Sequence, residues 1–398
     1  MATTTVRYDD LRNIVERYFK GKYFYVKTML AAGPANLLIN NISQPCSVFV
    51  TGKSSTKKSS ILELCRTLPQ TVWSNNFSAA SFVSGARNMD GEDLLPRLRN
   101  KWLITPELSA LFSASKSKFA STFGILTAVL DGRGYVIHTG FGEAGYADPI
   151  RFNWLGAIIR ITDTKMKQMG AMGHRLLFLH INSKRETFHD MEVRMDKMLS
   201  EGRTLDQKLS ICRNAISAVF LSLAQRYPTG IDWNNDSDNK RARCAVTKAA
   251  ITLRTLRGAI EANTAPNLED PSRLTELLYN ISRGNAVMSN RIHVTMEDVK
   301  PVVAIMIDSV PESRKQLLLS LLQNKGELDT NEYIDISNLK RKTVLERFAE
   351  LSALGVSEYT THENSVSNNA TKKIILQPEF SWLQDKKIMG MLDRSNLL

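Results

Sequence analysis

The strongest constraint on the fold is an alternation of short apolar runs with helical stretches between residues 46 and 182. Short strands separated by helices favour a mostly parallel sheet with helices on both faces. The sequence therefore predicts an α/β core over residues 46–182. The clearest apolar runs in this core are CSVFVT (46–51), KWLITPE (101–107), FNWLGAII (152–159) and HRLLFLHI (174–181).

The segments outside this core have different patterns. Residues 1–45 show amphipathic helical spacing with a break at AAGPAN, which predicts a helical lead-in. Residues 183–308 are helical apart from a polar stretch at 228–243, which we expect to be an exposed loop. Residues 312–398 contain a helix, a short link, a second helix and two strands around a polar hairpin tip. That order predicts a C-terminal winged-helix domain.

The chain carries an excess of positive charge. Its 398 residues include 52 lysines and arginines against 40 acids, a net charge of +12. A basic surface of this size favours a polyanionic partner, and nucleic acid is the first candidate. The composition, with 43% hydrophobic residues, is that of a globular protein.

Cysteine spacing and hydropathy exclude several other classes of protein. The four cysteines form no C-x-x-C pair, so the sequence predicts neither a zinc site nor a disulfide framework, but reduced and buried thiols. No apolar run approaches the roughly 20 residues that cross a bilayer. We therefore expect no membrane association and a cytoplasmic location.

A loop that resembles a phosphate-binding loop follows the first apolar run. In GKSSTKKS, Gly52, Lys58 and Ser59 match the pattern G-x-x-x-x-G-K-[ST], while Lys57 stands in place of the second glycine. In such a loop the backbone amides surround the phosphates, the lysine bridges the outer phosphates, and the hydroxyl binds Mg²⁺. The alternative is a polar turn that happens to contain a lysine.

The apolar run before this loop and the helical stretch after it favour nucleotide binding, because anions bind at helix N-termini. We expect Lys57 to be tolerated if its backbone is right-handed or extended. The sequence thus predicts an ATP site with Ser59 as the Mg²⁺ ligand. The expected cofactor-binding residues are Gly52, Ser54, Ser55, Thr56, Lys57, Lys58 and Ser59.

A second nucleotide motif should be a strand that ends in Asp-Glu, in which the glutamate positions the attacking water. The run KWLITPE has Glu107 in the glutamate place and Pro106 in the aspartate place. Because Glu107 follows an apolar run at the edge where α/β proteins bind ligands, we expect it to activate water. The alternative is a surface acid.

With GKSSTKKS, WLITPELSALF and MGHRLLFLHI in this order, the sequence resembles AAA+ ATPases, specifically the branch that contains the minichromosome-maintenance helicases, over residues 20–308. The resemblance implies an AAA+ P-loop core, a helical lid over residues 183–308, and hydrolysis of ATP. It also implies that Arg175 acts as an arginine finger on a neighbour's γ-phosphate and that Arg273 is the sensor-2 arginine. The guanidinium fork suits both tasks; ordinary salt-bridged arginines are the alternative.

The same resemblance implies a β-hairpin before the buried strand at NWLGAII. In this family the hairpin contacts DNA, and the polar candidates in DGRGYVIHTGFGEAGYADPIRFNWLGAI are His138 and Arg151. The sensor-1 place offers Arg160 or Thr162. Because the chain lacks a large N-terminal DNA-binding domain, it resembles the AAA+ proteins of mobile elements, phages and plasmids more than chromosomal helicases.

The C-terminal domain carries the remaining DNA candidates. We expect the second helix to pack through Leu345, Phe348, Leu351 and Leu354. In a winged helix the exposed basic groups contact DNA phosphates; a protein-binding surface or a solvated basic face is the alternative. The expected contacts are Lys340, Arg341, Lys342 and Arg347 on the helix and Lys372 and Lys373 on the wing.

Together these features predict an ATP-dependent DNA helicase or DNA-remodelling AAA+ ATPase in the replication of a mobile element or phage. The expected partners are DNA, further copies of the chain in a homo-oligomeric ring, by resemblance a hexamer, and other replication proteins. One alternative is a slowly or non-hydrolysing initiator or helicase loader, which Lys57 and Pro106 favour. Another is a AAA+ transcription regulator or defence ATPase with a protein-binding winged helix.

Overall fold

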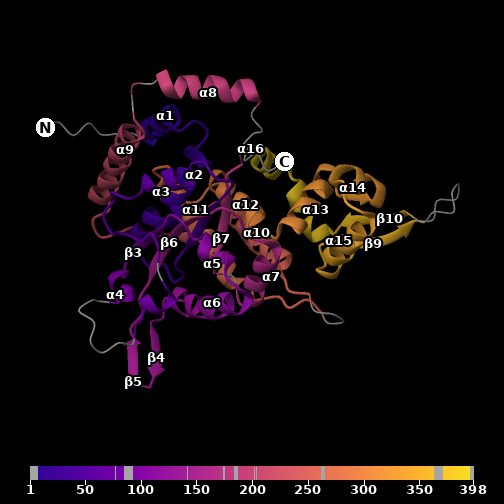
Figure 1. Cartoon of the computed structure of the whole chain (residues 1–398), viewed down its shortest axis with the longest axis horizontal. Coiled ribbons are helices and arrows are strands. Elements are labelled where there is room, and N and C mark those ends of the chain that lie inside the picture. The colour runs from indigo at the N-terminus through magenta and orange to yellow at the C-terminus, as the bar shows by residue number, and fades with distance from the viewer. Residues whose placement is uncertain are drawn as a thin grey trace. The chain divides into compact units, whose positions relative to one another are not determined.

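The computed structural model describes residues 8–76, 78–84, 93–140, 142–173, 175–182, 187–200, 202, 204–260, 265–362 and 371–394 (Figure 1). The chain forms two compact units, and each unit is assembled from three stretches of sequence. Unit 1 comprises Met1–Arg160, Leu179–Asp238 and Asn280–Val294. Unit 2 comprises Ile161–Phe178, Asn239–Tyr279 and Thr295–Leu398.

The core of the fold is a five-stranded parallel sheet, in the order β2-β3-β6-β1-β7. Every residue of β1 and of β6 is buried, as expected for parallel strands covered by helices on both faces. The α/β class predicted from the sequence is therefore confirmed. The strands are β1 (Ser47–Thr51), β2 (Thr71–Trp73), β3 (Lys101–Thr105), β6 (Phe152–Ile158) and β7 (Leu177–His180).

Close packing between the central strands depends on a glycine. Phe49 on β1 lies opposite Gly156 on β6, and a Cβ at Gly156 would lie 2.5 Å from the Phe49 ring. The ring of Phe49 also meets Trp154 edge-on, with 5.0 Å between the ring centroids. A glycine inside a strand often marks such a close approach.

The strand order determines what lies together at one edge of the sheet. Because all the strands are parallel, the segments that follow β1, β3 and β6 leave the sheet at the same edge, and β6 lies between the other two. Ligands of α/β proteins bind at this carboxyl edge. The loop beginning at Gly52 and the segment containing Glu107 are both found there.

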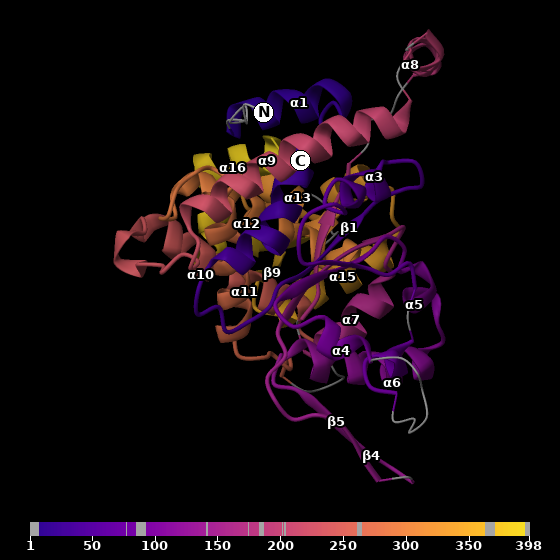
Figure 2. The ribbon, with the colours of Figure 1, turned by 90° about the vertical axis from the view of Figure 1, so that its left-hand side faces the viewer.

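Helices and one hairpin complete unit 1. Strands β4 (Tyr135–Thr139) and β5 (Gly142–Tyr146) pair antiparallel, as the sequence predicted, and extend away from the sheet as an arm in Figure 1 and Figure 2. The helices of this unit are α1 (Tyr8–Tyr18), α2 (Tyr23–Leu30), α3 (Lys58–Glu63), α4 (Leu94–Arg97), α5 (Ser109–Ser113), α6 (Lys116–Leu130), α8 (Phe188–Ser200) and α9 (Leu205–Arg226).

Unit 2 begins with α7 (Asp163–Ala171) and continues with α10 (Lys240–Arg257) and α12 (Val299–Asp308), whereas α11 (Ser272–Val287) passes from unit 2 into unit 1. Helix α10 starts within the stretch 228–243 that the sequence pattern assigns to a loop. The cause is local, because the Asn239 side chain accepts a hydrogen bond from the Ala242 amide and so caps the helix.

The C-terminal part of unit 2 combines four helices with a three-stranded antiparallel sheet in the order β8-β10-β9. The sequence predicts only a short link where the structure has β8 and α14. Asp329 caps α14 in a capping box with Glu332, a signal that the sequence does contain. The elements are α13 (Glu312–Gln323), β8 (Glu327–Asp329), α14 (Thr330–Ser337), α15 (Arg341–Ala353), β9 (Ser357–His362), β10 (Thr371–Leu376) and α16 (Lys386–Arg394).

Two expectations about buried side chains need correction. Helix α15 packs through Val344, Phe348 and Leu351, which are each at most 1% exposed, whereas Leu345 is only partly buried. Of the four cysteines, Cys244 is exposed on α10 while the other three are buried. Burial raises the pKa of Cys65 to about 12.

No helix in the described parts of the chain is both long and apolar enough to cross a bilayer.

Candidate functional site

The loop between β1 and α3 closes around the side chain of Lys58. Lys58 is the first residue of α3 and is only 7% exposed, and its Nζ donates hydrogen bonds to the carbonyls of Gly52 and Lys53, both at 2.7 Å. The Thr56 hydroxyl donates to the same Lys53 carbonyl at 2.9 Å. The buried ammonium group thus binds the start of a loop that contains five of the seven residues predicted to hold the nucleotide, while the other two, Lys58 and Ser59, begin α3.

Electrostatics link this lysine to the predicted acid. Burial lowers the pKa of Lys58, while the negative charge of Glu107 acts in the opposite direction. Glu107 therefore lies close enough to Lys58 for their charges to interact, although it follows a different strand. This proximity follows from the parallel sheet, which carries both segments to the same edge.

Gly52 is required by its surroundings. Its φ is +153°, and a Cβ at this position would lie 3.1 Å from both the Ile181 carbonyl and the Thr56 hydroxyl. The Ile181 amide in turn donates to the Thr51 carbonyl at 2.7 Å, which holds the neighbouring strand end against the loop. The lack of space for a side chain therefore explains why the first position of the motif is glycine.

Lys57 has a left-handed backbone, with φ +66° and ψ 25°. The expectation of a right-handed or extended conformation is therefore wrong. This conformation costs a residue other than glycine roughly 1–2 kcal/mol. The lysine therefore occupies a position at which the backbone conformation favours glycine. The Lys57 ammonium lies 5.4 Å from the centroid of the Phe19 ring, and this cation–π contact offsets part of the cost.

The hydroxyl groups of the loop differ in exposure. Ser54, Ser55 and Ser59 are exposed, whereas Thr56 is 8% exposed. Mg²⁺ prefers oxygen ligands and keeps several of its waters. The Ser59 hydroxyl and the Glu107 carboxylate could provide such oxygen ligands at one edge of the sheet. The residues present therefore fit a hydrated Mg²⁺ ion bound with a phosphate. Among the described residues no group of three or more His, Cys, Asp or Glu side chains could hold a metal by itself.

The backbone around Glu107 is fixed by the sheet. The amide of Leu108 donates to the Ala157 carbonyl on β6 at 2.9 Å, and the Leu108 side chain is buried. The exposed Glu107 carboxylate accepts a hydrogen bond from the Ser109 amide at 2.7 Å. Pro106 leaves the preceding position without a carboxylate, as the sequence indicates.

The two predicted arginines lie in unit 2 and border the same carboxylate. The Arg175 guanidinium donates to the Met172 carbonyl at 3.3 Å, and Arg273 pairs with Glu269 at 3.6 Å. A Cβ at Gly173 would lie 2.2 Å from Arg175 Nη1 and 3.7 Å from Glu269 Oε1. Gly173, with φ +99°, thus leaves space for Arg175 to fold back beside Glu269.

The two sensor-1 candidates differ in role. The Thr162 hydroxyl accepts a hydrogen bond from the Lys165 amide at 3.4 Å and caps α7. Arg160 is exposed just after β6. Thr162 therefore has a structural task of its own.

Of the two hairpin candidates, one lies on the hairpin. His138 is exposed on β4, opposite Glu143 on β5. Arg151 lies after the hairpin, immediately before β6, and its guanidinium donates to the Ile42 carbonyl at 3.2 Å. The placement of Arg151 on the hairpin is therefore wrong.

The basic residues of α15 lie mainly at its start. Lys340, Arg341 and Lys342 are exposed there, and Arg341 donates to the Asn331 side chain at 3.2 Å. Arg347 is partly buried and donates to the Tyr333 hydroxyl at 3.2 Å. Exposed cations at the start of a helix are not favoured by its dipole, so they gain from an external anion.

The two strand lysines differ from each other. The Lys372 ammonium lies 5.2 Å from the centroid of the Tyr359 ring. Lys373 forms an ion pair with Glu327 on the neighbouring strand β8, which offsets its charge, and its role as a DNA contact on the wing stays a prediction. The tip of the predicted wing, residues 363–370, lies outside the described residues.

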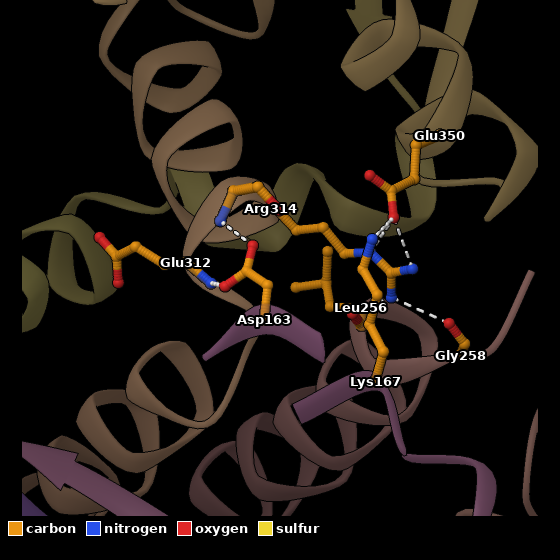
Figure 3. Close-up of polar contacts among 8 residues, drawn as sticks. Asp163, Lys167, Leu256, Gly258, Glu312, Arg314 and Glu350 are labelled. Atoms are coloured by element: carbon orange, nitrogen blue, oxygen red, sulfur yellow. Dashed lines mark hydrogen bonds and ion pairs between the residues drawn. The ribbon is translucent and has the colours of Figure 1, made fainter. Parts of the chain in front are cut away.

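Sequence reasoning missed a polar cluster in unit 2 that is built around the buried side chain of Arg314 (Figure 3). One oxygen of Glu350 on α15 accepts hydrogen bonds from Lys167 on α7 at 2.6 Å and from Nε and Nη2 of Arg314 on α13 at 3.0 and 2.8 Å. Arg314 Nη1 also donates to the carbonyls of Leu256 at 2.7 Å and Gly258 at 2.9 Å. Burial raises the pKa of Glu350, but the hydrogen bonds and charges of Lys167 and Arg314 outweigh it and lower the pKa below its usual value.

A second contact joins the first turns of α7 and α13. The Asp163 carboxylate accepts hydrogen bonds from the amides of Glu312 at 2.8 Å and Ser313 at 3.0 Å, and so caps α13. Burial raises the pKa of Asp163, but the hydrogen bonds from Ser313 and Glu312 and the charge of Lys167 outweigh it. The side chains of this cluster come from stretches far apart in the sequence, so no local motif could have identified them.

No protein-family model matches the sequence, and no curated protein matches it either.

Proposed function

We propose that this protein is a nucleoside triphosphatase of the AAA+ kind that uses ATP to remodel or unwind DNA in the replication of a mobile element or phage. The observation that carries the proposal is Lys58, buried in the loop after β1 and within electrostatic reach of Glu107 after β3. A cation placed to bind phosphate and an acid placed to orient water are two of the groups that catalyse transfer of a phosphoryl group to water.

In this proposal the Lys58 ammonium exchanges its two carbonyl partners for oxygens of the β- and γ-phosphates. Glu107 accepts a proton from a water molecule as that water attacks the γ-phosphorus, and the bond to the β–γ bridging oxygen breaks to release ADP. Ser59 would hold Mg²⁺, which neutralises the phosphate charge when it is bound. Arg175 and Arg273 are proposed to meet the γ-phosphate, in an oligomeric ring such as the resemblance implies.

The experiment that tests this function is an assay of ATP binding and phosphate release with wild-type protein and Glu107→Gln. We expect Glu107→Gln to bind a fluorescent ATP analogue as wild type does but to release phosphate about 100-fold more slowly, since general-base catalysis contributes on the order of 10²–10⁴. The matched control is Glu346→Gln, an exposed acid on α15. Absence of binding by wild type would refute the proposal, and full activity of Glu107→Gln would assign the base elsewhere.

The proposed DNA contacts predict a salt dependence. Changing Lys340, Arg341 and Lys342 to alanine should weaken binding of a fluorescent duplex and reduce the log–log salt slope by about 0.9 for each DNA phosphate that the protein no longer neutralises. Lys373→Ala is the matched control, because Glu327 already neutralises this lysine. An unchanged slope in the triple variant would show that the start of α15 does not bind DNA.

A second candidate is a protein that binds ATP and DNA without hydrolysing ATP. The left-handed Lys57 favours it, because the loop holds a strained residue where nucleotide-binding loops have glycine. Pro106 favours it as well, because a proline provides no carboxylate to anchor the metal and with it the attacking water. A water displaced by about 1 Å can cost on the order of 100-fold in rate. Tight binding of ATP with no phosphate release, with or without DNA, would support this alternative.

A further inference from the structure

The position of the Arg175 side chain depends on the end of α7. Met172 follows the last residue of α7, and its carbonyl accepts the hydrogen bond from Arg175 Nη1 at 3.3 Å. Gly173 has no side chain to occupy the space beside the guanidinium. A displacement of α7 therefore carries the anchor of Arg175 with it.

Contacts with the C-terminal helices α13 and α15 hold helix α7 in place. Asp163 at its start binds the first amides of α13, and Lys167 one turn later binds Glu350 on α15 (Figure 3). Both contacts involve charged groups, and charge-assisted hydrogen bonds are shorter and stronger than neutral ones. A helix of nine residues moves as a rigid segment, so these contacts fix where its other end lies.

Glu350 connects α15 to helices α13 and α7. Arg314, whose side chain is 2% exposed, orients the Glu350 carboxylate through two hydrogen bonds, while Lys167 is 41% exposed and binds the same carboxylate from α7. Glu350 also lies one turn after Arg347 on the helix whose start carries Lys340, Arg341 and Lys342. The proposed DNA-contacting residues and the link to α7 thus share one helix.

We propose that Glu350 and Lys167 are positioning residues. They transmit a displacement of α15, caused by DNA binding, through α7 to Arg175. This inference rests on the proposed function and adds to it a route by which DNA regulates hydrolysis. A shift of α15 against the DNA phosphates moves the carboxylate of Glu350, the ammonium of Lys167 follows it, and the end of α7 moves the anchor of Arg175.

The test uses Lys167→Met in the full-length protein, because this change leaves the contact between Glu350 and Arg314 intact. We expect DNA affinity and the hydrolysis rate without DNA to stay within about twofold of wild type, while stimulation by DNA falls about fivefold or more, as coupling of this kind typically allows. Lys167→Arg should restore the stimulation. Lys248→Met, an exposed lysine on α10, is the control and should leave it unchanged.

A double-mutant cycle identifies the residue through which Lys167 acts. If Lys167 acts through Arg175, then Lys167→Met should cause no further loss of stimulation in an Arg175→Lys background, which keeps a cation at this position and with it a measurable rate of hydrolysis. An equal loss in both backgrounds would overturn the route through Arg175. Stimulation by DNA that is unchanged in Lys167→Met would overturn the inference while leaving the proposed function intact.

Hydrogen exchange provides a readout that does not depend on catalysis. In the protein without ligands, Lys167→Met should accelerate exchange of the amides of residues 169–173 relative to wild type, whereas Lys248→Met should not. Unchanged exchange in this segment would overturn the link between α15 and the anchor of Arg175. Wild-type protein that hydrolyses ATP equally fast with and without DNA would overturn the regulatory role alone, whereas wild-type protein that binds no ATP would overturn the proposed function as well.

Discussion

Replacing Arg314 with methionine lowers the free energy of unfolding by about 2–4 kcal/mol, because the buried carbonyls of Leu256 and Gly258 lose their donor and an unsatisfied buried polar group costs about 1–3 kcal/mol. Methionine replaces most of the volume but none of the donors, so the carbonyls of Leu256 and Gly258 and the Glu350 carboxylate lose their hydrogen bonds. Urea unfolding followed by circular dichroism measures the difference.

The matched control is Arg341→Met, which removes an exposed guanidinium from the same unit and should change the free energy of unfolding by less than about 0.5 kcal/mol. Combining Arg314→Met with Glu350→Leu removes both charges and should recover part of the loss. An Arg314→Met protein within about 1 kcal/mol of wild type would show that water or other groups replace these hydrogen bonds.

We expect replacement of Lys58 with methionine to reduce the proposed ATP hydrolysis by about 10²–10³-fold, the range found when one preorganised electrostatic group is removed from an active site. The methionine fills the space of the lysine stem but frees the carbonyls of Gly52 and Lys53 from their ammonium partner. Phosphate release and binding of a fluorescent ATP analogue measure the two effects separately.

Lys53→Met is the control, since it removes an exposed lysine from the same loop outside the marked motif positions. Its hydrolysis rate should stay within about threefold of wild type, because loop cations outside the site act mainly through the screened surface potential. A Lys58→Met protein as active as wild type would remove the loop from the proposed site.

The sequence was informative where burial imposes a pattern. Strands β1, β3 and β6 follow from their apolar runs, since strands buried on both faces contain few polar residues. The neighbours of each strand do not follow, because hydropathy reports burial and not pairing. The proximity of Glu107 to Lys58 was expected only from the general rule that parallel strands present their carboxyl ends at one edge.

The sequence was uninformative where a side chain or backbone angle is set by distant groups. The left-handed angle of Lys57 could be suspected from the motif, in which glycine occupies that place, but lysine alone does not predict it. The ion pair between Lys373 and Glu327 depends on strand register, and the cluster around Glu350 depends on three helices. These interactions are tertiary, and no local pattern encodes them.

The way the chain alternates between its two units limits how this protein can be divided or recombined. Six alternating stretches give five passages of the chain between the units, so neither unit is encoded by one uninterrupted segment. A version starting at Pro311 would keep α13 to α16 but lose Lys167, Leu256 and Gly258, which bind Glu350 and Arg314. A genetic exchange that replaced only this C-terminal segment would separate Arg314 and Glu350 from matched partners, so inheritance should favour transfer of the chain as a whole.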